Sequence, residues 1–158
     1  MMDKNWPRWI FASMTEYFSD AINIPVFIEG MDRETKDLKD FAEIRVDGPW
    51  MNELSVDVWK FRIEINILIQ SVMGDKNLHR FYDDIGDVNF AFTNCISVYK
   101  HPDINGQNGD GSFLGCFKLA IDRYDRENIK TSNYGQIDKN VKLQQATIEA
   151  HYEMFLNI

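Results

Sequence analysis

The sequence predicts an α+β fold: a mostly antiparallel sheet with long strands or a projecting hairpin arm, and two helices packed on one face. Three observations predict it. Segments 56–72 and 142–156 alternate apolar and polar residues with a period of two, which is typical of strands that bury one face. Two other segments carry apolar residues at spacings of one, three and four, which indicates amphipathic helices. Shorter strand-like runs lie between turn signals.

The size and composition indicate a single domain over residues 1–158. The chain has 158 residues, 44% of them hydrophobic and 13% aromatic, which is enough apolar material for one core. We expect possible projecting loops at 31–40 and 103–112.

The first part of the chain predicts a helix over 7–21. Asn5 is a candidate N-cap, and Pro7 falls in the first turn, where its missing N–H costs nothing. The following segment, 22–30, is short and β-branched. Because Pro25 cannot donate a ladder hydrogen bond, we expect an edge strand or a strand start there.

The next strands surround the longest two-faced segment. Residues 31–40 are highly charged and predict a solvated connector. A strand over 41–50 is expected to stop at the turn signal Asp47-Gly48-Pro49. In the strand that follows, residues 59–70 alone extend about 40 Å at ~3.3 Å per residue, roughly twice the usual strand length. This length predicts an arm that leaves the core.

A second helix is predicted after Gly74, with Asp75 as N-cap and an apolar stripe that reaches Phe92, although Gly86 interrupts it. Segments 95–101 and 113–124 then predict a hairpin.

The last part predicts a loop and a strand. Residues 126–140 are polar and are expected to form a loop. Residues 142–156 could form a helix, but their strict period of two and the β-branched pair Thr147-Ile148 favour a strand.

Charge and hydropathy exclude some function classes. The net charge of −8 and the pI near 4.8 disfavour sequence-specific DNA binding, because nucleic-acid affinity depends on cations that displace counterions. We also expect no signal peptide and no membrane association, since the longest nearly apolar run is far short of a membrane span.

Cys95 and Cys116 are the only cysteines, and each lies in an apolar, strand-like segment. A secreted disulfide scaffold would contain more cysteine. We therefore expect two reduced thiols in the core, as in a reducing compartment.

The loop at 103–112 carries side-chain oxygens at spacings that suggest a calcium loop. An EF-hand counted from Asp103 would need Gly and Glu where the chain has Asn108 and Leu114, so the match fails. We expect a hairpin tip, with contact to a partner through Asp103 and Asp110 as an alternative. His79, His101 and His151 are widely separated, so we expect neither a metal nor a cofactor.

No sequence pattern predicts an enzyme. The chain lacks a nucleophile elbow, a P-loop and a dinucleotide fingerprint. Glu64, Glu149 and Glu153 could face one another as a hydrolytic pair, but alternating charges on a solvated sheet face explain them more simply.

The long ribbons also suggest assembly, because strand edges can pair with another chain and an arm must bury its apolar face. At this point the chain resembles the neck or tail-terminator proteins of tailed bacteriophages. The segments that carry the resemblance are RWIFASMTEYF, IPVFIEG, FAEIRVDGPW, WKFRIEINILIQS, NLHRFYDDIG and ATIEAHYEMF.

The resemblance implies a virion protein that assembles in the host cytoplasm into a ring, typically of six copies. Such a ring ends the tail tube and joins tube or sheath proteins to head-completion or connector proteins. It leaves a channel through which DNA passes without specific binding, and an acidic lining would repel that DNA. The interface would use aromatic anchors such as Trp50 and Trp59, for which core packing is the alternative. The alternative function is a small soluble ligand- or protein-binding module without catalysis.

Overall fold

The computed structural model describes residues 3–29, 40–72, 78–120, 128–138 and 143–157. Two helices and seven strands form in these residues. Their order is α1 (Trp6–Ala21), β1 (Val26–Ile28), β2 (Asp40–Ser55), β3 (Val58–Val72), α2 (Leu78–Phe92), β4 (Ile96–Tyr99), β5 (Phe113–Leu119), β6 (Ile129–Asp138) and β7 (Leu143–Asn157). The predicted α+β class is confirmed.

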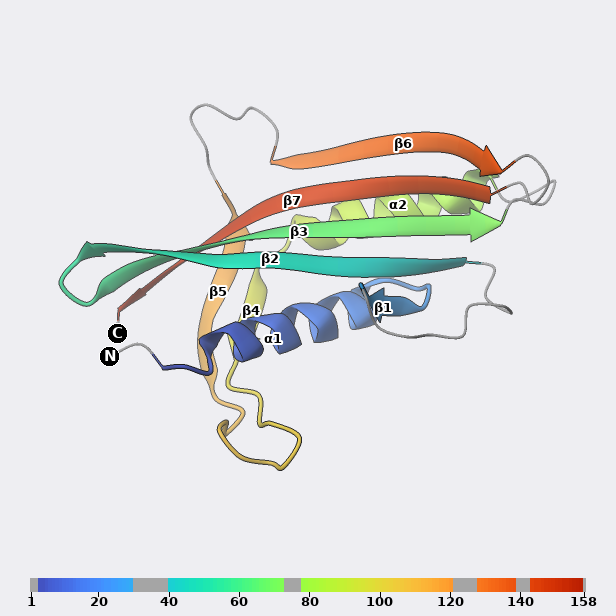
Figure 1. Ribbon diagram of the computed structural model, residues 1–158. Helices are drawn as coiled ribbons and strands as arrows, with labels where there is room; N and C mark the ends of the chain where they lie inside the picture. Colours follow the sequence, from blue (N-terminus) through green and yellow to red (C-terminus); the bar gives the residue numbers. More distant parts are fainter. Residues whose placement is uncertain (1–2, 30–39, 73–77, 121–127, 139–142, 158) are drawn as a thin grey trace.

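The sheet has the strand order β1-β2-β3-β7-β5-β4, and β6 pairs with β7 beside β5. All pairs are antiparallel except β1 with β2. Figure 1 shows the long strands β2, β3 and β7 side by side, while the β4–β5 hairpin runs steeply across their direction. The β2–β3 hairpin extends beyond the rest of the sheet, as expected for an arm.

One core lies between the inner face of the sheet and the two helices. The alternating residues of β3 and β7 supply its centre, and each is at most 2% exposed: Phe61, Ile63, Ile65, Ile67, Ile69, Ala146, Ile148, Ala150, Tyr152 and Met154. The helices add Trp6, Phe18, Phe81 and Phe92 to the same cluster. The period-two patterns of both long segments therefore correspond to one buried face, as predicted.

The expectation that other copies must cover this apolar face was wrong. β3 pairs along its length with β2 on one side and with β7 on the other, so it offers no free edge. Both helices lie against the inner face, because their apolar stripes need the same burial. Any contact with other proteins must use different surfaces.

The predicted end of the second strand at Asp47-Gly48-Pro49 was wrong. β2 continues to Ser55, with a register shift between Asp47 and Trp50 that accommodates one extra residue. Gly48 permits the bulge because its φ of +103° is unfavourable for other residues. The turn signal marks a bulge, and the hairpin turns at Val56-Asp57 instead.

The polar segment predicted as a loop contains a strand. β6 pairs with β7 from Ile129↔Ala150 to Asp138↔Leu143. Its side chains from Ile129 to Gly135 are exposed or half-buried, so no apolar alternation marks the strand in the sequence. Backbone hydrogen bonds to β7 supply the order that side-chain burial does not.

The two cysteines are not free core thiols, contrary to the prediction. Cys95 and Cys116 form a disulfide across the β4–β5 hairpin, with their Cα atoms 5.9 Å apart. Cys116 pairs in register with Ser97, so Cys95 lies diagonally opposite it on the same face. Cys95 is exposed, because this face of β4 points away from the core.

The helix predictions hold with small changes. α1 has Pro7 in its first turn, but the Asn5 side chain donates to Asp3 and makes no cap hydrogen bond with the helix. α2 includes Gly86, which is exposed on the helix surface. The predicted cap Asp75 and most of the connector 31–40 lie outside the described residues.

Candidate interaction surface

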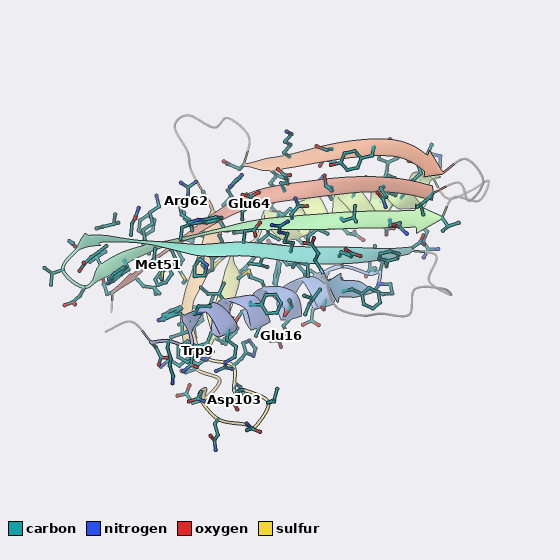
Figure 2. All side chains as sticks on the ribbon, viewed as in Figure 1. Trp9, Glu16, Met51, Arg62, Glu64 and Asp103 are labelled. Carbon is teal, nitrogen blue, oxygen red and sulfur yellow. A yellow bond between two sulfur atoms is a disulfide. The ribbon has the colours of Figure 1, made fainter. Side chains whose placement is uncertain are left out.

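The β2–β3 hairpin ends in an apolar tip, which we call the distal arm (residues 50–58). Four of its side chains are exposed although they are apolar: Trp50 at 55%, Met51 at 42%, Leu54 at 54% and Val56 at 84%. Single exposed apolar residues are common, but a cluster on one projection is typical of a contact surface. Figure 2 shows Met51 on this projecting end.

The base of the distal arm is braced by polar contacts on the outer sheet face. Lys60 pairs with Glu153 at 3.1 Å, and its ammonium lies 5.6 Å from the centre of the Phe155 ring. Trp50 is the register partner of Arg62 on the same face. These contacts link β3 to β7 at the base of the distal arm, and they do not cover its apolar tip.

The sheet edges are poor templates for another strand. Within the described residues, β1 pairs with β2 only at Ala42–Ile44, so the outer edge of β2 continues without a partner strand towards the tip. Gly48-Pro49 interrupts that edge, and Pro49 has no N–H to donate. β6 has two register shifts of its own. Side chains of the distal arm are therefore better suited than strand edges to make contacts.

A second projection, the loop 102–112, is held by its own side chains. Asp103 accepts hydrogen bonds from the N–H groups of Asn105 and Gln107 (both 2.9 Å) and from the Asn108 amide (2.8 Å). The hydrogen bond from Gln107 is the main cause that lowers the pKa of Asp103. The carboxylate therefore keeps this network unless the solution is strongly acidic.

Helix α1 anchors the loop from the side. The Arg8 guanidinium donates to the carbonyls of His101 (2.7 Å) and Asn108 (2.8 Å), and the Trp9 indole N–H also donates to Asn108 (3.0 Å). At the tip, Ile104 is fully exposed at 101%. These hydrogen bonds hold the loop in place beside α1 and leave Ile104 exposed. Figure 2 shows Asp103 of this loop below α1.

Replacing Gly109 by alanine is expected to disrupt this loop. A Cβ at this position would lie 2.4 Å from the backbone oxygens of both Lys100 and His101, and backbone atoms cannot move aside cheaply. We expect amide hydrogen exchange over 102–112 to accelerate by at least about tenfold, while exchange in β3 stays unchanged. Gly86→Ala on α2 is the control, since its Cβ would meet nothing within 4 Å and its φ is not positive, so exchange over 102–112 should stay as in wild type. Equal protection in Gly109→Ala and wild type would contradict the packing described.

The residues predicted as interface candidates are in different environments. Trp50 is exposed on the distal arm, whereas Trp59 is half-buried and packs against the core. Asp103 and Asp110 are engaged within their own loop, Asp110 by Ser112. Sequence reasoning missed Leu54, Val56 and Ile104. The sequence did offer one signal: each of these apolar residues lies beside turn residues and belongs to none of the periodic apolar patterns that predict the core.

The candidate carboxylates of β3 and β7 lie near one another on the outer face of the sheet, each opposite a residue of another type. Glu64 pairs in register with His151, Glu149 with Asn66 and Glu153 with Arg62, all on the outer face of the sheet. The Glu149 carboxylate accepts a hydrogen bond from the Asn66 amide at 3.2 Å, and Glu153 pairs with Lys60. Within the described ranges, no group of three or more His, Cys, Asp or Glu residues could hold a metal ion.

The largest cavity described lies between α1 and β4 and has a volume of about 400 Å³. Glu16 and Asp20 contribute carboxylates from α1, and the imidazole of His101 lies 3.2 Å from Glu16. The Ser13 hydroxyl accepts a hydrogen bond from the Tyr99 backbone N–H at 3.0 Å. The cavity combines polar and aromatic side chains and offers room for a small molecule.

Comparison with known proteins supports the fold and no further assignment. No protein-family model and no curated protein matches the chain. One solved chain, whose name describes no function, is similar with a TM-score of 0.53 and 10% identity, over 98% of this chain and 96% of that chain. A likeness at this identity shows the fold alone. None of the described helices is long and apolar enough to cross a membrane.

Proposed function

We propose that this protein is a structural virion subunit that forms a ring at the neck or top of a bacteriophage tail. The ring ends the tube and joins it to head-completion proteins, and its lumen lets DNA pass. The observation that carries the proposal is the distal arm, whose apolar side chains Leu54 and Val56 are 54% and 84% exposed. The resemblance of the sequence to tail-terminator proteins supplies the virion context.

The surface chemistry supports an assembly subunit over a catalyst. Two ordered projections, the distal arm and the loop 102–112, present apolar side chains at separate corners of the molecule. A closed ring uses two different surfaces on each subunit, which a protein with two distinct projections can provide. The net charge of −8 in each copy would keep DNA from adhering to the channel wall.

Removing the apolar tip of the distal arm is expected to abolish the ring. In Leu54→Ser with Val56→Ser, each lost anchor is expected to weaken the subunit contact by about tenfold or more. Light scattering after size exclusion should give roughly six times the 18.5 kDa chain mass for wild type and a monomer for the double variant.

Phe90→Ser provides the matched control, because Phe90 on α2 is also exposed, at 71%. This variant should assemble like wild type, and electron microscopy should show discs with a central channel. A wild-type protein that remains monomeric at every concentration, alone and with tail tubes, would refute the proposed function.

The cavity between α1 and β4 supports the alternative function, a ligand-binding module. Its two α1 carboxylates, Glu16 and Asp20, favour a small cationic ligand such as an amine. The hollow on the outer sheet face is smaller, at about 190 Å³. A stable monomer that binds an amine by ligand-observed NMR, with the binding lost in Glu16→Gln, would favour this alternative over the ring.

A further inference from the structure

The groove at the amino-terminal end of α1 is the concave feature that complements the distal arm. Its apolar wall is formed by Trp6 and Trp9 of α1, Leu114 of β5 and Leu156 of β7, and its rim by Asp3, Lys100 and Asn157. The groove has a volume of about 290 Å³, which accommodates two aliphatic side chains. It borders the arm end of β3, since Leu156 pairs in register with Trp59 and Asn157 with Val58.

The charges of the groove and of the distal arm are complementary. The Lys100 ammonium lies 5.6 Å from the centre of the Trp9 ring and forms no salt bridge with any residue in the described ranges. On the arm, Glu53 and Asp57 flank Leu54 and Val56, and all four are exposed. Asp3 at the groove rim is turned to Asn5, which donates twice to its Oδ1 atom. Lys100 is the cation of the groove lining and the group that the arm carboxylates approach, although its charge already acts on the neighbouring Asp110 carboxylate.

Val58 at the base of the distal arm pairs with Asn157 of the groove rim, but the tip with Leu54 and Val56 is not seated in the groove of its own chain. Its turn, Val56-Asp57, joins two strands that are paired along the ribbon, and β3 continues from the turn into the centre of the sheet. Bending the tip back would break those ladder hydrogen bonds. A contact between a convex arm and a concave groove on different parts of the chain is heterologous, and it forms a ring when the rotation closes.

We propose that the distal arm of one copy seats in the α1 groove of the next copy. Leu54 and Val56 enter the apolar part, and Glu53 and Asp57 approach Lys100. This inference rests on the proposed ring, and it names the two surfaces that form each subunit contact.

Cysteine cross-linking between two variants tests the contact directly. Val56→Cys chains are mixed with Asp3→Cys chains under mild oxidation, and a non-reducing gel measures the covalent dimer. We expect the mixture to give several-fold more dimer than either variant alone. Val56→Cys mixed with Phe90→Cys is the control, since Phe90 lies on α2, outside the groove, and it should give no such excess.

Charge reversal provides a second readout that does not depend on new cysteines. Lys100→Glu alone, and Glu53→Lys with Asp57→Lys alone, should each weaken assembly by about tenfold. Combining the three substitutions should recover most of that loss, which a purely structural effect would not do.

The outcomes separate this inference from the proposed function. If rings form but Val56→Cys links only to itself, or the combined variant is no better than the single reversals, the arm does not enter the groove and this inference is wrong, while the ring stands. If no ring forms under any condition, both are wrong.

Discussion

Replacing Phe61 by alanine is expected to lower the free energy of unfolding by about 3 to 5 kcal/mol. Phe61 is 0% exposed near the start of β3, and its ring centre lies 5.0 Å from that of Trp6. The substitution removes the contact between β3 and the start of α1. It leaves a cavity there, because the other core contacts of β3 and α1 prevent them from moving together to fill it. The midpoint of thermal unfolding should fall by roughly 10 °C for a chain of this size.

Chemical denaturation monitored by tryptophan fluorescence would measure this loss. Phe90→Ala is the control, because Phe90 loses the same atoms from an exposed position on α2. Its free energy of unfolding should stay within about 0.5 kcal/mol of wild type. A similar loss in both variants would mean that Phe61 is not a central core residue.

The second large effect is expected at Asp84, which is buried on α2 near the start of β2. Among the residues that the structure describes, none donates a hydrogen bond to its Oδ2 atom. Burial, with the neighbouring Asp40 carboxylate as the next cause, raises the pKa of Asp84 from 3.8 to about 6, although Arg80 opposes the shift. Asp40 itself is held by the Ser71 hydroxyl and by Arg80 at 3.2 Å, so it does not relieve Asp84.

The sign of the pH effect follows from the raised pKa. Below pH 3.8 Asp84 is protonated in both the folded and unfolded states and costs nothing. Between pH 4 and pH 6 the unfolded chain loses the proton first, so stability falls as the pH rises, and above pH 6 the cost is constant. The shift corresponds to a cost of at most about 3 kcal/mol at pH 8.

Asp84→Asn removes this charge. Relative to wild type, the variant should gain about 2 kcal/mol of unfolding free energy on going from pH 4 to pH 8. Urea denaturation at the two pH values measures the difference, and Asp83→Asn on the exposed side of α2 is the control. If the stability difference between Asp84→Asn and wild type did not change with pH, the pKa of Asp84 would not be raised in the folded protein.

Much of the fold could be predicted from the sequence, because several elements bury a single face. β3, β7 and α1 each bury one periodic set of side chains, and that burial leaves a direct pattern in the sequence. β6 leaves no such pattern, since its order comes from backbone pairing with β7. The candidate surface was only partly predictable, because Trp50 stands out by its type, whereas Leu54, Val56 and Ile104 are unusual only once their exposure is known.

The sequence by itself determined which residues share a face and which segments form helices or long strands, because apolar periodicity records burial along one element. The tertiary structure alone decided that β2 passes through Gly48-Pro49 and that Cys95 meets Cys116. It also decided that the arm tip remains uncovered. These features depend on contacts between segments far apart in the chain, and the spacing of apolar residues within one segment does not predict such contacts.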